Sequence, residues 1–348
     1  MSRVGIRELA AELGMSISTV SRAMNAREDV SAATRERVTA AAERLGYQPN
    51  QSGRTLRRGA TGTVALVIQT NTARTEMGET FYFSLCDGLQ QVLATKSLDL
   101  VLLPVGASAD PDQYLVNAVD RHLADAYVVS NTHRVDRRIE YLTQRAVPFV
   151  ALGRGGVSDH AWLDLDFEGV AAHSVARLAG LGHERIALAS DDRDITSTFE
   201  FVRGYRRALA EHGLPTDSGW EIRVPDMPEG GAILADRLLA MSPRPTAVVL
   251  AQETLAIGLY RRLREAGVEP GSDLAVIGFR KNPVCDHLLP SLTSFEVSLD
   301  DYGRRLGEIV LGRLTPDCPD DQPVQEVWAM KIVPGESDAH PPREKAAR

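Results

Sequence analysis

Short apolar runs recur along most of the chain, and they constrain its fold more than any other feature. Such runs separated by longer amphipathic stretches are typical of parallel sheets covered by helices on both faces. About 270 residues with this pattern exceed one compact sheet, so we predict two α/β subdomains with a cleft between them. A ligand would bind in that cleft, beyond the carboxyl ends of the strands. The runs occupy residues 64–68, 98–103, 126–129, 148–152, 185–189, 247–250 and 274–279.

The first 50 residues have a different pattern, typical of three helices. Apolar residues recur at helical spacing over 6–13, and Gly14 follows as a stop signal. Ser16 and Ser31 can cap a second and a third helix, and Gly46 ends the third. Two short helices joined by a tight turn and followed by a third predict a helix-turn-helix bundle. An ordinary small helical domain is the alternative.

The charge of the chain is unevenly distributed. The net charge is −8, but residues 1–60 contain ten Arg, no Lys and six acidic residues, a net of +4. The rest of the chain therefore carries −12. A basic head (residues 1–60) on an acidic body (the rest of the chain) indicates a polyanionic partner for the head alone. Double-stranded DNA is such a partner for a helix-turn-helix.

The head and the body together resemble the LacI/GalR family of bacterial transcriptional repressors. In the head the resemblance is carried by Ile6–Ala10, Ser16–Arg22, Asn25, Val30-Ser31, Thr34-Arg35, Val38 and Leu45–Asn50. In the body it is carried by residues 181–187, 204–209, 245–247, 256–258, 266–268 and 276–279. The resemblance implies a periplasmic-binding-protein-like effector domain that dimerises and a near-palindromic operator. We expect no cofactor.

The resemblance also assigns DNA contacts to the second helix. Ile17 and Ser18 would face base edges, with Ile17 in apolar contact with a thymine methyl, and Arg22 would also reach a base. Contacts to the phosphate backbone, which position rather than specify, would come from the remaining polar residues. These are Ser16, Thr19, Ser21, Asn25, Ser31, Thr34, Tyr47 and Asn50.

Residues 50–60 are polar, basic and rich in glycine, and by pattern alone they form a flexible linker. The resemblance implies a hinge helix that orders on the operator, in which Leu56 wedges into the minor groove and Arg54 contacts phosphates. Gly53 stands where the family usually has Ala, and it weakens such a helix by about 1 kcal/mol. A buried linker residue is the alternative for Leu56.

Several positions that contact effector in this family are changed. Gln252 and Glu253 replace an Asn-Asp pair, Arg280 replaces an Asp, and Phe201 replaces an Arg, with Arg203 displaced by two. Arg280 could bind a carboxylate, a phosphate or paired hydroxyls; alternatively it pairs internally with Glu253. The remaining candidates are aromatic residues that could stack on a sugar face, and one arginine. The predicted effector site thus comprises Phe81, Tyr82, Arg154, Phe201, Gln252, Glu253 and Arg280.

We therefore predict a sequence-specific repressor controlled by a small-molecule effector, for which a sugar is the first candidate. The alternatives are a sugar phosphate or other anion as effector, an activator of the same architecture, a sugar receptor without DNA function, and an α/β enzyme. The enzyme reading lacks support, because the chain has no H-E-x-x-H, P-loop or G-x-S-x-G motif and no catalytic or metal-ligand spacing. His183 and the three scattered cysteines are expected to be structural.

The predicted organisation follows from these segments. The helix-turn-helix domain covers 1–49, the hinge 50–60, and the effector domain 61–334. Its subdomains are expected at 61–152 plus 290–318 and at 153–289 plus 319–334, and 335–348 form a disordered tail. No leucine heptad follows residue 334, which favours a homodimer over a tetramer. The chain lacks an apolar leader and an apolar run long enough to span a membrane, so a cytoplasmic protein is expected.

Overall fold

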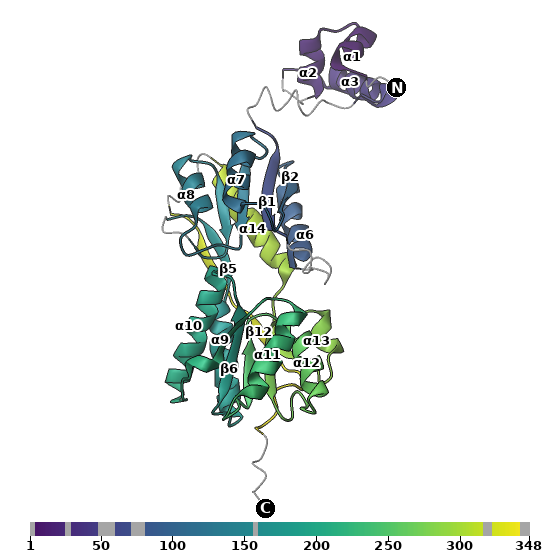
Figure 1. Cartoon of the computed structure of the whole chain (residues 1–348). Helices are drawn as coiled ribbons and strands as arrows, with labels where there is room; N and C mark the ends of the chain where they lie inside the picture. Colours follow the sequence, from purple (N-terminus) through teal and green to yellow (C-terminus); the bar gives the residue numbers. More distant parts are fainter. Residues whose placement is uncertain are drawn as a thin grey trace, which may run out of the picture. The chain divides into compact units, whose positions relative to one another are not determined.

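A computed structural model describes residues 4–24, 29–47, 60–70, 81–155, 159–315 and 322–341. The chain divides into two compact units, Met1–Thr61 and Gly62–Arg348 (Figure 1). None of the described helices is long and apolar enough to cross a membrane.

Within its described residues, the first unit contains three helices, α1 (Ile6–Leu13), α2 (Ile17–Met24) and α3 (Ala32–Leu45). The apolar residues that face its core include Leu9 and Val38, neither of which is exposed to solvent. This three-helix bundle confirms the predicted helix-turn-helix.

The predicted helix boundaries of this unit are also confirmed. Gly14 adopts the left-handed conformation (φ 62°) that ends α1, and Gly46 does the same after α3 (φ 63°). The Ser16 hydroxyl accepts a hydrogen bond from the backbone N–H of Thr19 at 3.0 Å, and Ser31 caps α3 in the same way. The caps satisfy amide groups that would otherwise lack partners, which makes these boundaries readable in the sequence.

The second unit contains two six-stranded sheets. The strands of the first sheet are parallel and follow the order β11-β5-β4-β3-β1-β2. They are β1 (Thr63–Gln69), β2 (Asp99–Val105), β3 (Ala126–Ser130), β4 (Phe149–Leu152), β5 (Trp162–Leu165) and β11 (Gln325–Trp328). Helices α6 (Phe81–Ala94) and α14 (Leu299–Leu314) cover one face, and α7 (Pro111–Asp120) and α8 (Arg137–Gln144) cover the other (Figure 1).

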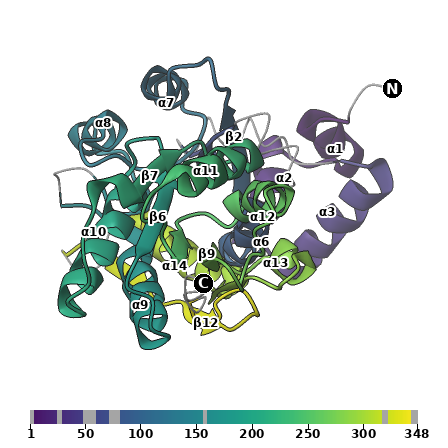
Figure 2. The same cartoon turned by 60° about the horizontal axis from the view of Figure 1, so that its bottom comes forward.

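The second sheet follows the order β12-β10-β9-β8-β6-β7, parallel except for β12. Its strands are β6 (Ile186–Asp191), β7 (Glu221–Val224), β8 (Ala247–Leu250), β9 (Ala275–Arg280), β10 (Thr293–Glu296) and β12 (Lys331–Val333). One face packs on α9 (Phe167–Gly180) and α10 (Thr196–Glu211), the other on α11 (Pro228–Ala240) and α12 (Leu255–Glu265) (Figure 2). A 3₁₀ turn (Ser218–Trp220) precedes β7, and the short α13 (Pro283–His287) follows β9.

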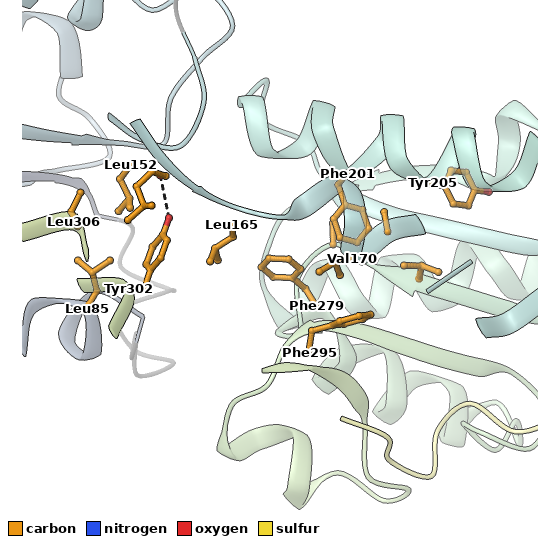
Figure 3. Packing of buried hydrophobic residues seen from close by; sticks show 14 of the residues in the cluster. Leu85, Leu152, Leu165, Val170, Phe201, Tyr205, Phe279, Phe295, Tyr302 and Leu306 are labelled. Carbon is orange, nitrogen blue, oxygen red and sulfur yellow. Dashed lines mark hydrogen bonds between the residues drawn. The ribbon is translucent and has the colours of Figure 1, made fainter. Parts of the chain in front are cut away.

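Alternate residues of each central strand face opposite helical layers. In β1, Val64 and Leu66 pack toward α6 and α14, whereas Ala65 and Val67 pack toward α7 and α8. Both sets are buried, which explains why the sequence shows continuous apolar runs rather than alternation. One apolar cluster continues from the first sheet to the second, passing through Leu165 (Figure 3). The predicted α/β fold with two subdomains is confirmed.

The predicted subdomain boundaries need correction. The chain passes between the sheets after β5, after β10 and after β11. Strand β5 therefore belongs to the first subdomain, although we expect residues 153–289 in the second. Strand β11 also belongs to the first, although we expect residues 319–334 in the second. Strand β10 belongs to the second, because it pairs with β9. The sequence of a short apolar strand does not indicate which sheet it joins. That depends on which neighbouring strands are available to pair with it.

The predicted disordered tail also needs correction for residues 335–341. Ser337 is fully buried, accepts a hydrogen bond from the Thr293 N–H at 2.9 Å and donates one to the Val276 carbonyl at 2.6 Å. Asp338 accepts from the Thr293 hydroxyl at 2.7 Å. His183 is buried and lies 2.8 Å from the Ala339 carbonyl, as its expected structural role requires. The segment packs because it satisfies buried polar groups of β9 and β10, which composition does not reveal. Residues 342–348 lie outside the described part.

Candidate effector site

A cavity of about 310 Å³ lies between the two sheets. It opens beyond the carboxyl ends of β6, β8 and β9 from the second sheet and of β3 and β5 from the first, as predicted for an α/β cleft. Its volume is at the lower end of the range of about 300–1,000 Å³ for small-molecule sites. Its lining includes Phe81, Tyr82, Asn131, Leu165, Phe167, Arg193, Ser197, Asp226, Met227, Gln252, Glu253, Thr254, Phe279, Arg280 and Asn282.

Aromatic rings form much of the apolar wall. Phe167 and Phe279 stack with centroids 4.8 Å apart and an angle of 10° between their planes. Phe81 and Tyr82, at the start of α6, meet edge to face at 5.2 Å. Flat apolar faces beside polar groups suit a ligand with both C–H surfaces and hydroxyls.

Arg280 and Glu253 form a buried ion pair in the opposite wall. Arg280 Nη2 lies 3.2 Å from Glu253 Oε1, and their side chains are 11% and 6% exposed. Glu253 also accepts hydrogen bonds from Asn282 Nδ2 at 3.0 Å and from the Arg280 backbone N–H at 3.3 Å. Burial raises the pKa of Glu253, and the Arg280 guanidinium opposes this shift. The internal pairing considered for Arg280 is thus the arrangement in this structure.

Arg280 also reaches across the cleft. Its guanidinium carbon lies 5.5 Å from the centre of the Phe81 ring, which belongs to the other subdomain. The side chain therefore contacts both walls of the cavity and is well placed to respond to its opening or closing.

A second arginine, Arg193, faces the cavity and is also neutralised. Its Nε lies 2.9 Å from Asp191 Oδ2, and Asp191 is buried at the end of β6. Burial raises the pKa of Asp191, but the Arg193 guanidinium outweighs it and holds the pKa below its ordinary value. Asp226 also faces the cavity and accepts a hydrogen bond from the Thr254 hydroxyl. Both cavity arginines are thus matched by carboxylates.

Asn131 enters the cavity from the first subdomain in the left-handed conformation (φ 50°). A buried arginine, Arg138, holds this segment: it donates to the carbonyls of Ser130 and Asn131 at 3.1 and 3.0 Å. Asp136 balances its charge at 2.7 Å, and both side chains are 1% exposed. These contacts of Arg138 fix a backbone conformation at Asn131 that Asn adopts more easily than most residues.

Two of the predicted effector residues lie elsewhere. Phe201 is fully buried and meets Phe279 edge to face at 6.0 Å (Figure 3). Phe279 lines the cavity, whereas Phe201 does not. The expectation that Phe201 contacts the effector therefore does not hold: its position on α10 faces the sheet rather than the cleft. The displaced Arg203 is partly exposed and pairs with Glu168 and with the buried Glu200.

Arg154 does not line the cavity either. Its Nε lies 3.1 Å from Asp164 Oδ2, its Nη1 lies 3.5 Å from Glu200, and its guanidinium packs over Trp162. Asp164 lines a smaller cavity of about 90 Å³ that shares Phe81 and Asn131 with the main one. Arg154 thus acts as the counter-charge of Asp164 rather than as a ligand group.

Several cavity residues are missing from the predicted site. They share a signal that was available, because each stands at or near a strand end facing the cleft. The acidic pair Asp191-Asp192 is likewise at the end of β6. The missed residues with the clearest roles are Asn131, Phe167, Arg193, Asp226, Phe279 and Asn282. Among the described residues, no group of three or more His, Cys, Asp or Glu side chains is arranged to hold a metal ion.

In the first unit, α2 presents the predicted base-reading residues to solvent. Ile17 is 40% exposed, and Ser18 and Arg22 are exposed as well. Arg22 Nη1 lies 3.0 Å from Asp29, in a pair whose side chains are about half exposed. An exposed pair of this kind contributes at most about 1 kcal/mol, so a base contact can replace it.

The predicted phosphate contacts of this unit are only partly described. Ser16 and Ser31 are exposed caps, and Thr19, Ser21, Thr34 and Tyr47 are half-buried beside them. Asn25, Asn50, Arg54 and Leu56 lie outside the described residues, as does the predicted hinge helix.

A helix-turn-helix unit joined to a two-sheet unit with a polar and aromatic cleft defines a ligand-binding, DNA-binding regulator. Models of two families match the chain: bacterial regulatory proteins of the lacI family over residues 5–50, and the periplasmic binding protein-like domain over residues 175–337. The chain belongs to the LacI family of transcriptional regulators.

Relatives match nearly the whole chain. The HTH-type transcriptional regulator CelR of Thermobifida fusca is 30% identical over 96% of this chain and 98% of its own length. The regulator AglR of Rhizobium meliloti (strain 1021) is 32% identical over 95% of this chain and 93% of its own length. A solved structure of a CelR–cellobiose complex is 29% identical, covers 96% of this chain and all of its own, and has a TM-score of 0.73.

Proposed function

We propose that this regulator is a repressor whose operator affinity is set by a neutral sugar bound between the two sheets. The observation that carries the proposal is the pairing of each cavity arginine with a carboxylate, beside stacked aromatic rings. Matched charges leave little attraction for a free anion, whereas ion pairs present both donors and acceptors to hydroxyl groups. The C–H face of a sugar ring packs on aromatic rings. The cellobiose bound in the CelR complex supports the sugar class.

The proposal includes a homodimer that reads a near-palindromic operator in the cytoplasm, through Ile17, Ser18 and Arg22 of each α2. Two-fold symmetry in the protein matches two-fold symmetry in such a site. Light scattering on the free protein and on its operator complex would measure two chains in each case; one chain per duplex would contradict the dimer.

The test is a thermal-shift screen with sugars, the corresponding sugar phosphates and organic acids. A ligand that binds the folded state raises the melting temperature, and a hit must then change the affinity for operator DNA. We expect neutral sugars to be the hits. If only phosphorylated sugars or organic acids stabilise the protein, the neutral-sugar assignment is wrong.

Two substitutions show whether a hit binds in this cavity. Phe279→Leu removes a ring face from the cavity and should weaken sugar binding about tenfold, a loss of ~1.4 kcal/mol. Phe201→Leu removes a buried ring behind it, so it should lower the melting temperature with a smaller effect on Kd. Equal Kd values for Phe279→Leu and the unsubstituted protein would place the ligand elsewhere.

A further inference from the structure

The main cavity adjoins a second chamber of about 300 Å³, nearly its own size. Three residues line both: Arg193, Asp226 and Met227. The second chamber therefore begins where the main cavity ends, at the boundary formed by the segment after β6 and the segment after β7. A ligand confined to one sugar ring would leave this adjoining space to solvent.

The walls of the second chamber come from both subdomains. The first contributes the ends of β1 and β2, with Gln69, Thr70 and the small residues Gly106, Ala107 and Ala109. The second contributes Asp191, Asp192 and Pro225. A ligand that occupies this chamber would contact both subdomains, as a ligand in the main cavity does.

The chemistry of the second chamber suits hydroxyl groups. Among the described residues, its charged lining comprises three carboxylates, Asp191, Asp192 and Asp226, against one guanidinium, Arg193. This excess of negative charge repels anions and provides acceptors for hydroxyl donors. Phe and Tyr are absent from the described lining, in contrast to the main cavity, and the small residues at 106, 107 and 109 leave room for a bulky polar group.

The boundary residues can serve both chambers at once. Arg193 is oriented by Asp191, and Asp226 is oriented by Thr254, so neither is free to turn away. A glycosidic linkage passing this boundary would place one sugar ring against Phe167 and Phe279 and the next against the ends of β1 and β2. Together the two chambers provide a volume well within the range of about 300–1,000 Å³ for small-molecule sites.

We propose that the effector is an oligosaccharide that spans both chambers, with one end in the aromatic cavity and further units in the carboxylate-lined chamber. This inference rests on the proposed sugar effector and adds the size of the ligand and the position of its second subsite.

The test measures Kd by calorimetry on the full chain with three series of increasing length. The series are glucose, cellobiose and cellotriose; glucose, maltose and maltotriose; and galactose, melibiose and raffinose. In at least one series we expect affinity to increase tenfold or more from one unit to three, a gain of about 1.4 kcal/mol or more, since the added units form hydrogen bonds to charged groups.

Two variants test whether the increase in affinity with ligand length arises in the second chamber. Ala107→Trp fills it from an exposed loop, and Asp192→Ala removes an exposed carboxylate that does not line the main cavity. Both should remove most of the gain with length and leave the Kd of the single-unit sugar unchanged. Ala210→Trp is the matched control, because Ala210 is exposed on α10 and lines neither chamber.

The outcomes separate the inference from the proposed function. If a monosaccharide binds as tightly as its longer homologues, or if Ala107→Trp weakens all lengths equally, the spanning site is wrong and the sugar effector stands. If no sugar of any length binds, the proposed sugar effector is wrong, and this inference with it.

Discussion

Each arginine of the main cavity is paired with a buried carboxylate, and the pair of Arg280 with Glu253 joins residues far apart in the sequence. Glu253 follows β8, whereas Arg280 ends β9. Removing one member of such a pair leaves an uncompensated charge in a poorly solvated site, which costs several kcal/mol. These pairs therefore hold the cavity walls in place besides presenting polar groups to a ligand.

Asp164 makes folding stability depend on pH. Burial raises its pKa from 3.8 to about 6, with Arg154 opposing the shift. An acid with a higher pKa in the folded state binds more protons when folded, so its contribution to stability is present below pH 3.8 and is lost as the pH rises toward 6.

We therefore expect Asp164→Asn to reduce the fall in the free energy of unfolding across this pH window. Urea titrations at several pH values between these limits would measure the slope. Asp236→Asn, at an exposed position on α11, is the control and should retain it. An unchanged slope in the Asp164 variant would assign the pH dependence to other groups.

Arg22 is expected to carry base recognition. Arg22→Ala should reduce the preference for operator over scrambled duplex by about 1–3 kcal/mol, because an arginine contact to a base edge is lost. The melting temperature should hardly change, since the pair with Asp29 is exposed. Competition binding in fixed salt measures the preference.

A matched control for Arg22→Ala lies in the same unit. Arg44 forms a similar exposed pair with Glu12 at 2.8 Å on α3, and Arg44→Ala removes the same charge. It should lower the affinity for both duplexes about equally. If Arg22→Ala and Arg44→Ala reduce the preference for operator equally, the lost positive charge explains the effect and base recognition by Arg22 does not.

At the scale of elements, glycines allow helices of the second unit to cross in close contact. A Cβ at Gly303 of α14 would lie 2.1 Å from the Leu85 carbonyl of α6, and one at Gly88 would lie 1.9 Å from the Asp300 carbonyl. The same arrangement joins α11 and α12 through Gly231 and Gly258. Backbone contact of this kind leaves no side chain that could move aside.

Gly303→Ala should therefore destabilise the protein by about 1–3 kcal/mol through displacement of α14 from α6. Gly312→Ala on the same helix has no atom within 4 Å of the added Cβ and should be neutral or stabilising by up to ~1 kcal/mol. Chemical denaturation of both variants measures the difference. Equal stabilities would show that the crossing adjusts without cost.

At the scale of the whole molecule, effector and operator binding must influence each other equally. If the sugar changes operator affinity by a given factor, the operator must change sugar affinity by the same factor. We expect a factor between about 5 and 150. Calorimetry with the sugar, in the presence of operator or of scrambled duplex, tests this. The same sugar affinity on both duplexes would mean that the cavity does not control DNA binding.

Much of the site is absent from the sequence prediction because proximity to the cavity is not a local property. Phe201 and Phe279 are both aromatic residues near the cleft, yet Phe279 lines the cavity and Phe201 packs behind it. Gln252, Glu253 and Arg280 were identifiable because the family pattern marks their positions. Arg193 and Asn131 belong to no motif. Only their positions just after strand ends could have indicated that they face the cleft.

The sequence by itself determined the helix-turn-helix with its caps at Ser16 and Ser31, and the alternation of strands and helices in the second unit. These features depend on periodicity and on hydrogen bonds between near neighbours. Only the tertiary structure decided which sheet β5, β10 and β11 join, that Ser337 packs on β9 and β10, and that Arg280 pairs with Glu253. These depend on hydrogen bonds and charges between segments whose separation along the chain says nothing of their distance in space.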